Sequence, residues 1–139
     1  MNAKTQDLQD FFGEVIYSYS RAQAIEDGVL VDVSETAKEA GFRFPVAITQ
    51  AAWGDCVAWS DEDNARQCYQ DESGRLWDVL TMLLYAIRRS NEGSNIPFQL
   101  IRIPRGGRAI KAREMTLKAI CGPGDDMEPV ITIMLPDED

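Results

Sequence analysis

The clearest hydrophobic pattern in the chain lies between Gly74 and Arg89. Apolar residues recur there every three or four positions, which is the spacing of one face of an α-helix. Ser73 precedes the segment as a candidate N-cap, and Arg88 and Arg89 suit the negative end of the helix dipole. The apolar face is broad enough to predict a helix that lies across a β-sheet; it comprises Leu76, Trp77, Val79, Leu80, Leu83, Leu84, Tyr85 and Ile87.

The C-terminal third of the chain predicts that sheet. Apolar and polar residues alternate with a period of two, which is typical of strands with one solvated face. Glycine-rich segments separate the strands, at Arg105-Gly106-Gly107-Arg108 and at Gly122-Pro123-Gly124-Asp125-Asp126, and both favour turns. We therefore predict a three-stranded antiparallel meander, with strands at Phe98–Ile103, Arg113–Ile120 and Val130–Leu135.

The rest of the chain indicates mostly helices, so the predicted class is α+β, with N-terminal helices packed on the C-terminal meander. Residues 29–33 read as a short extra strand and residues 42–48 as extended, because Pro45 resists helix. The acidic segment 61–72 is interpreted as a loop. Candidate helices are an amphipathic segment Leu8–Tyr19, Arg21–Asp27 capped by Ser20, a segment from Ser34 or Thr36 to Gly41 with Thr36 and Glu39 spaced as a capping box, and Thr49–Trp59.

Length and composition predict one globular domain over residues 1–139. Hydrophobic residues make up 45% of the chain and charged residues 27%, as in ordinary folded proteins. No apolar run reaches the roughly 18 residues that cross a bilayer, and the first residues lack the apolar core of a signal peptide. We therefore expect a cytoplasmic protein without membrane contact; the pattern does not indicate an oligomeric state.

The chain contains no histidine, which excludes Ser-His-Asp and Cys-His nucleophilic sites and most zinc chemistry. The three cysteines, Cys56, Cys68 and Cys121, form no C-x-x-C pair and are interpreted as reduced, buried residues. Asp125 and Asp126 could hold magnesium beside a substrate phosphate, but we favour a Gly-Pro-Gly-Asp turn, which explains the same residues without a metal. No cofactor, metal site or catalytic residue is predicted.

Charge is distributed unevenly along this chain, whose net charge is −9. A basic strip interrupts the acidic sequence, and a Gly-Gly pair within it could approach a phosphate or simply form a hairpin loop. An acidic cluster precedes the long helix and is either a solvated loop or a mimic of DNA phosphates. The basic residues are Arg102, Arg105, Arg108, Lys111 and Arg113; the acidic residues are Asp61, Glu62, Asp63, Asp71 and Glu72.

Several short segments resemble, as a set, a family of small acidic proteins of unknown function that is carried by bacterial plasmids, integrative conjugative elements and phages. The resemblance covers nearly the whole chain and implies an intact domain, but it brings no functional residues with it. It implies an accessory role, such as protection of the mobile element against host defence. The segments are 12–16, 19–33, 41–47, 75–80, 122–126 and 128–136.

Three functions follow as hypotheses. The first is a non-enzymatic accessory protein whose acidic cluster binds and inhibits a host nucleic-acid-binding or defence protein with a basic surface, in the manner of anti-CRISPR or anti-restriction inhibitors. The second is direct nucleic-acid contact through the basic strip. The third is a divergent enzyme of the ADP-ribosyltransferase-like type, with Arg21 and Glu114 as the arginine and the catalytic glutamate.

Overall fold

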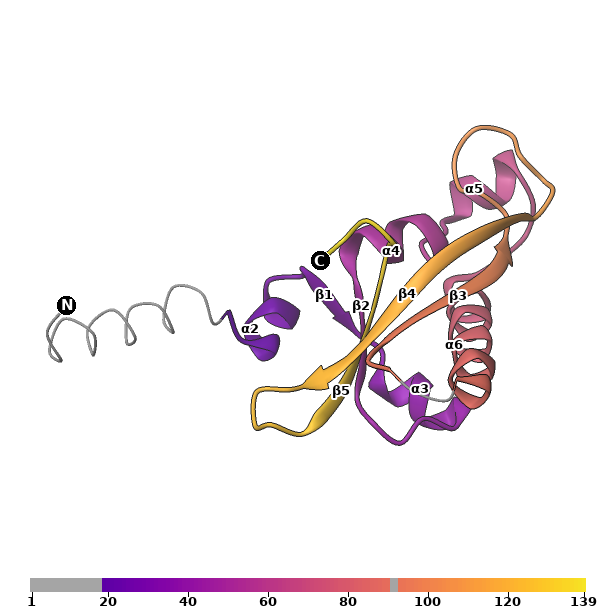
Figure 1. The fold of residues 1–139 in the computed structure, drawn as a ribbon. Helices are drawn as coiled ribbons and strands as arrows, with labels where there is room; N and C mark the ends of the chain where they lie inside the picture. The colour runs from indigo at the N-terminus through magenta and orange to yellow at the C-terminus, as the bar shows by residue number, and fades with distance from the viewer. Residues whose placement is uncertain (1–18, 91–92) are drawn as a thin grey trace, which may run out of the picture.

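A computed structural model describes residues 19–90 and 93–139. A β-sheet forms its centre, and helices lie at one face and at the ends of the sheet (Figure 1). The expected amphipathic helix Leu8–Tyr19 falls almost entirely outside the described residues. The elements are α2 (Arg21–Glu26), β1 (Leu30–Asp32), α3 (Ser34–Ala40), β2 (Val46–Thr49), α4 (Gln50–Cys56), α5 (Asp61–Arg66), α6 (Glu72–Arg89), β3 (Asn95–Arg102), β4 (Arg113–Pro123) and β5 (Pro129–Met134).

The sheet has five strands in the order β1-β2-β5-β4-β3 and is mixed rather than antiparallel throughout. The three strands of the predicted meander are present, and β3, β4 and β5 pair antiparallel in sequence order. The prediction was wrong about the extent of the sheet, because β2 adds to β5 in parallel, with Val46 opposite Ile131. The short β1 then pairs antiparallel with β2, so the predicted extra strand extends the same sheet.

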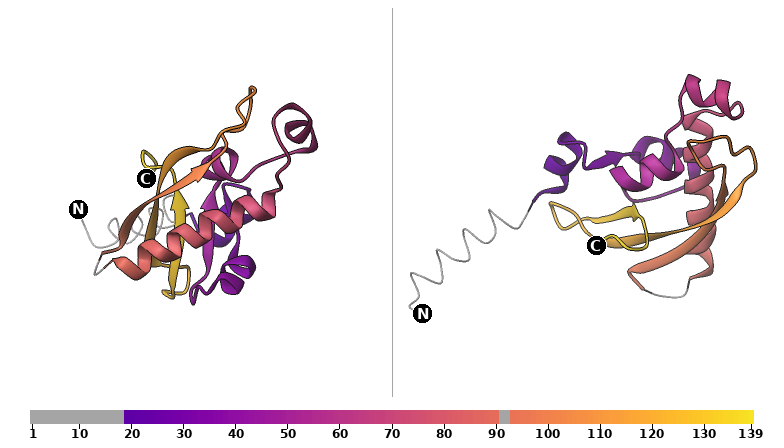
Figure 2. Two further views of the ribbon diagram at one scale, coloured as in Figure 1. Left: turned by 90° about the vertical axis from the view of Figure 1, so that its right-hand side faces the viewer. Right: turned by 90° about the horizontal axis from the view of Figure 1, so that it is seen from above.

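The hydrophobic core lies between one face of the sheet and the helices α3, α4 and α6. The long helix α6 lies across the sheet, as Figure 2 shows. The strand residues that face this layer alternate along each strand, and Ile48 and Ile133 are opposite each other at its centre. Helix α6 contributes Val79, Leu80 and Leu83, each with 0% of its surface exposed. The predicted helix across a sheet is therefore confirmed.

Three predictions about local structure were wrong, the first of them only for part of its segment. Residues 61–66 form helix α5 and not a loop, because Ser60 and Asp63 form a capping box that starts it; residues 67–71 are the loop that was predicted. The long helix begins earlier than expected, since the side chain of Asp71, not Ser73, caps it by accepting from Gly74 N. Helix α3 has no side-chain cap at all: its N-cap position is Val33, and the expected box of Thr36 and Glu39 is absent.

The opposite face of the sheet carries partly exposed side chains, and α2 is fastened to it by Arg21. The Arg21 guanidinium donates to Thr132 Oγ1 at 2.6 Å and to the Ile131 carbonyl at 2.7 Å. The carboxylate of Asp125, in the β4–β5 turn, accepts from the backbone N–H groups of Arg21 and Ala22. Among the described residues, no helix is long and apolar enough to cross a bilayer.

Candidate interaction site at the tip of the sheet

One end of the molecule is formed by two segments that are distant in sequence (Figure 1). We call it the tip: it comprises α5 with the following residues 67–71, and the β3–β4 loop, residues 103–112. Gln67 joins the two segments, because its Nε2 donates to the carbonyls of Pro104 at 2.8 Å and Ala109 at 2.6 Å. Its Oε1 accepts from Gly106 N at 3.0 Å. The Gln67 side chain alone therefore makes three hydrogen bonds that hold the loop against the end of α5.

Asp63 makes a second connection within the tip. It is only 1% exposed, and its carboxylate accepts from Arg105 Nε at 2.7 Å and from Arg66 Nη2 at 2.8 Å. Burial acts to raise the Asp63 pKa, but hydrogen bonds from Arg105 and from Ser60 outweigh it and lower the pKa to about 2. Asp63 thus stays ionised and ties the acidic cluster to the basic strip.

The remaining residues of the predicted acidic cluster divide into two kinds. Asp71 and Glu72 support local structure: Asp71 caps α6, and Glu72 Oε2 accepts from Trp59 N at 3.2 Å. Asp61 and Glu62 are exposed, and their side chains have no hydrogen bond or ion pair with the residues that the structure describes. Two of the five predicted carboxylates are thus free for a partner.

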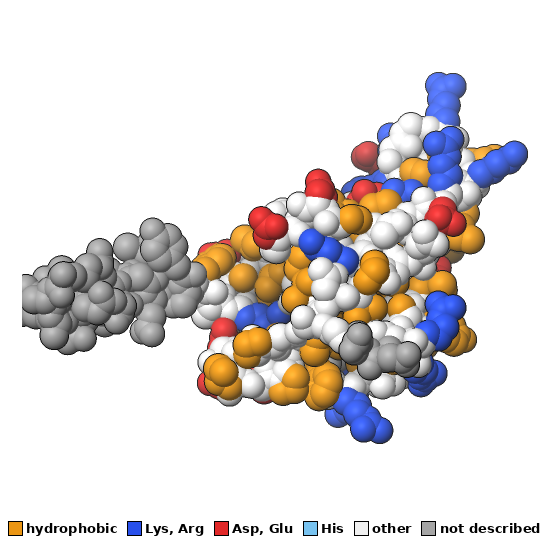
Figure 3. Space-filling model, viewed as in Figure 1, with side chains coloured by type: hydrophobic (Ala, Val, Ile, Leu, Met, Phe, Trp, Pro, Cys, Tyr) orange, Lys and Arg blue, Asp and Glu red, His pale blue; other side chains and the backbone are white. Residues whose placement is uncertain are grey.

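The basic strip divides in the same way. Arg102 pairs with Asp55 at 2.6 Å, and Arg105 pairs with Asp63. Arg108, Lys111 and Arg113 are exposed and make no ion pair within the described ranges 19–90 and 93–139. Basic side chains gather at this end of the surface (Figure 3). Because Gly106 and Gly107 have φ values of +92° and +65°, the loop does contain the glycine-dependent turn that the sequence predicted.

Exposed apolar side chains at the tip were missed from the sequence. Tyr69 is 83% exposed and Ile110 is 62% exposed. They lie on the two segments that Gln67 joins. Tyr69 is two residues after Gln67, and Ile110 follows Ala109, whose carbonyl accepts a hydrogen bond from Gln67. The sequence did contain one signal for this exposed surface: Tyr69 is an aromatic residue in a polar segment that was interpreted as a solvated loop. The tip therefore combines free charges of both signs with a large exposed aromatic ring.

The sequence of this chain was compared with protein-family models, with curated proteins and with solved structures. A family model, described as a family of unknown function (DUF6573), matches residues 8–139. The chain belongs to this family. Comparison with curated proteins and with solved structures gives no match. The prediction that the chain belongs to a family of unknown function is therefore confirmed over nearly the whole chain.

The structure does not bring the residues of the enzyme hypothesis together. Arg21 is bonded at Ile131 and Thr132, which pair with Cys121 and Ile120 of β4, whereas Glu114 lies six residues earlier on the same strand. At about 3.3 Å per residue the separation along β4 is about 20 Å. No group of three or more potential metal ligands occurs in the part of the chain that the structure describes, and its cysteines are free.

The three cysteines differ in environment. Cys56 is buried, as expected, whereas Cys68 and Cys121 are only partly buried. Burial raises the pKa of the Cys56 thiol to about 11, so this side chain is a neutral core residue at pH 7 rather than a nucleophile.

Proposed function

We propose that this protein is a non-enzymatic binding protein that contacts another protein through its tip. The observation that carries the proposal is that Tyr69 and Ile110 are both exposed and lie beside unpaired charges. They belong to the two segments of the tip that the Gln67 side chain connects. Tyrosine and arginine are enriched in protein interfaces, and exposed aromatic rings are frequent hot spots. Unpaired charges of both signs suit a protein partner better than a nucleic acid, whose backbone is uniformly anionic.

We further propose the partner class suggested by the resemblance: a host nucleic-acid-binding or defence protein that a mobile element benefits from inhibiting. Asp61 and Glu62 would face basic residues of that partner, and electrostatic attraction would accelerate the encounter at low salt. Asp63, which is occupied by Arg66 and Arg105, would position the contact surface and not touch the partner.

The test uses the full chain with a photo-crosslinking amino acid in place of Tyr69, expressed in a bacterium that carries a family member. We expect one partner to be crosslinked in near-stoichiometric amount, and the yield to fall when Ile110→Ser is added. The matched control places the crosslinker at Tyr85, which is 53% exposed on α6. An equal pattern of products from positions 69 and 85, or no product from position 69, would overturn the proposal.

Direct nucleic-acid binding is a second candidate, favoured by the unpaired Arg108, Lys111 and Arg113. Three phosphate contacts give a slope of about −2 in a plot of log Kobs against log salt concentration for a single strand. We expect the substitution of all three by glutamine to abolish that slope in an anisotropy titration. Absence of binding at about 50 mM salt, where phosphate contacts are strong, would exclude this function.

A further inference from the structure

The outermost strand of the sheet, β3, has one edge that no described strand covers. It stands last in the order β1-β2-β5-β4-β3 and pairs with β4 at its other edge. Bonded and non-bonded residue pairs alternate along an antiparallel ladder, and the pair of Ser94 and Cys121 is bonded, because Cys121 N donates to the Ser94 carbonyl at 2.7 Å. Every second residue of β3 therefore directs its backbone N–H and C=O groups away from β4; these residues are Asn95, Pro97, Gln99 and Ile101.

The outward backbone groups of β3 are accessible. All four residues are exposed, and Ile101 is 66% exposed. Pro97 has no N–H, so its place at an outward position costs the ladder with β4 no hydrogen bond. The N–H groups of the other three bond to no residue in the described ranges. An edge with unpaired donors and acceptors is a template for a further strand.

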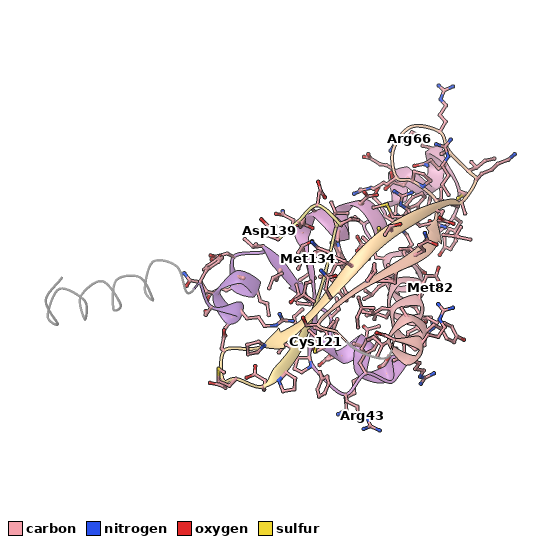
Figure 4. All side chains as sticks on the ribbon, viewed as in Figure 1. Arg43, Arg66, Met82, Cys121, Met134 and Asp139 are labelled. Atoms are coloured by element: carbon pink, nitrogen blue, oxygen red, sulfur yellow. The ribbon has the colours of Figure 1, made fainter. Side chains whose placement is uncertain are left out.

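Helix α6 and this edge of β3 border one groove, whose volume is about 420 Å³. Figure 4 shows Met82 on the side of the molecule that α6 and β3 form. The groove is lined by Met82, Ala86 and Arg89 of α6, by Pro97, Phe98 and Gln99 of β3, and by Thr116 of β4. One face of the helix therefore continues the surface of the strand edge, and no acidic residue lies in the lining.

That face of α6 carries opposite charges at its two ends. Asp78, Met82, Tyr85 and Arg89 follow one another at intervals of three or four residues, so they share one side of the helix. Asp78 and Arg89 are exposed, and neither forms an ion pair with a described residue. Arg75, one turn earlier, is the cation that acts on Asp78, but its guanidinium donates to backbone carbonyls. Both charges are thus available to a partner.

The same face is complementary to itself when a second helix runs in the opposite direction. The midpoint between Asp78 and Arg89 is also the midpoint between Met82 and Tyr85. A twofold axis at this point therefore brings Asp78 of each copy to Arg89 of the other, and Met82 to Tyr85. Each charge lies about 8 Å along the helix from the axis, at 1.5 Å per residue. The groove brings this part of α6 to residues 97–99 of β3, so one axis can serve the helix and the strand.

We propose that this protein forms a twofold dimer in which the β3 edges of two copies pair antiparallel and the two α6 helices pack side by side over them. With the axis at Phe98, Asn95 pairs with Ile101 of the second copy, and Pro97 pairs with Gln99. These pairs make about six backbone hydrogen bonds, because each Pro97 lacks one donor. The two sheets become one continuous sheet. This interface uses no residue of the tip, so it is independent of the contact proposed there.

The test is sedimentation velocity of the full chain over a concentration series from about 1 μM to about 1 mM, in which we expect a reversible monomer–dimer equilibrium. Arg89→Asp places like charges opposite each other twice and should raise the dimer Kd about a hundredfold. The double variant Asp78→Arg, Arg89→Asp exchanges the two charges and should restore the dimer. The matched control is Arg43→Asp, which changes an exposed arginine that lies apart from Met82 (Figure 4) and should dimerise like the wild type.

A second pair of variants tests the strand edge. Gln99→Pro removes an outward N–H that β4 does not use and should abolish the dimer, whereas Gln99→Ala keeps this donor and should dimerise normally. A photo-crosslinker at Tyr85 should give a covalent homodimer. The proposal is refuted by a monomer throughout the series, by an unchanged Kd in Arg89→Asp or Gln99→Pro, or by a charge-exchanged variant as weak as Arg89→Asp. If Gln99→Pro does not fold, the charge variants decide.

Discussion

Replacement of Gln67 by alanine should loosen the tip without unfolding the protein. The side chain makes three hydrogen bonds to the backbone of the β3–β4 loop, and each contributes about 0.5–1.5 kcal/mol. Water can replace part of this at an exposed loop, so we expect the free energy of local opening to fall by about 2 kcal/mol. Such a change corresponds to about 30-fold faster exchange of loop amides, since 1.4 kcal/mol is a factor of ten.

Hydrogen exchange followed by mass spectrometry measures this directly. Peptides that cover residues 103–112 should exchange faster in Gln67→Ala, whereas peptides from β5 should not change. Gln99→Ala is the control, because Gln99 is exposed on β3 and its side chain makes no hydrogen bond to the described residues. Unchanged exchange in the loop, or acceleration spread equally over β5, would refute the assignment of Gln67 as the connection between the two segments.

Three further predictions concern stability. Leu83→Ala, in a helix residue with 0% exposure, should lower the free energy of unfolding by about 3 kcal/mol, and a loss under 1 kcal/mol in urea denaturation would contradict the described core. Ser60→Ala removes the N-cap of α5 and should lower the free energy of unfolding by about 1 kcal/mol in urea denaturation. Ser73→Ala, at the cap position expected from the sequence, should leave it unchanged in the same assay. The pKa of Asp63 is about 2 in the folded protein, below the value near 3.9 of an unfolded chain, so its contribution to the free energy of unfolding is complete above about pH 4 and is lost as the pH falls toward 2. Asp63→Asn should therefore reduce the loss of stability between about pH 4 and about pH 2, measured by denaturation curves at a series of pH values. An unchanged pH dependence would argue against the ion pairs of Asp63 with Arg66 and Arg105.

Residues with a local signal were placed correctly from the sequence. The periodicity of Leu76, Leu80 and Leu83 defined α6, and the alternation of apolar residues defined β3, β4 and β5. The parallel pairing of β2 with β5 was not predictable, because 79 residues separate the end of one strand from the start of the other, and no local pattern specifies a partner at that distance. A four-residue strand such as Val46–Thr49 also has too few positions to show a period.

The candidate site was predicted in part, for a related reason. Charge runs identified the acidic cluster and the basic strip, but their pairing through Asp63 and Arg105 depends on the fold. Sequence patterns treat both runs as solvated, whereas Asp63 is buried and stabilised by arginines. Arg102 was identified within the basic strip, but its pairing with Asp55 likewise depends on the fold.

The position of β5 has a consequence for synthesis of the chain on the ribosome. This strand follows the other four in sequence, yet it occupies the middle of the sheet, between β2 and β4. Until it leaves the exit tunnel, β1–β2 and β3–β4 are two separate strand pairs whose inner edges have no partner. The sheet is therefore completed only late in translation, and a nascent chain that stalls before residue 129 would present two open edges to chaperones and proteases.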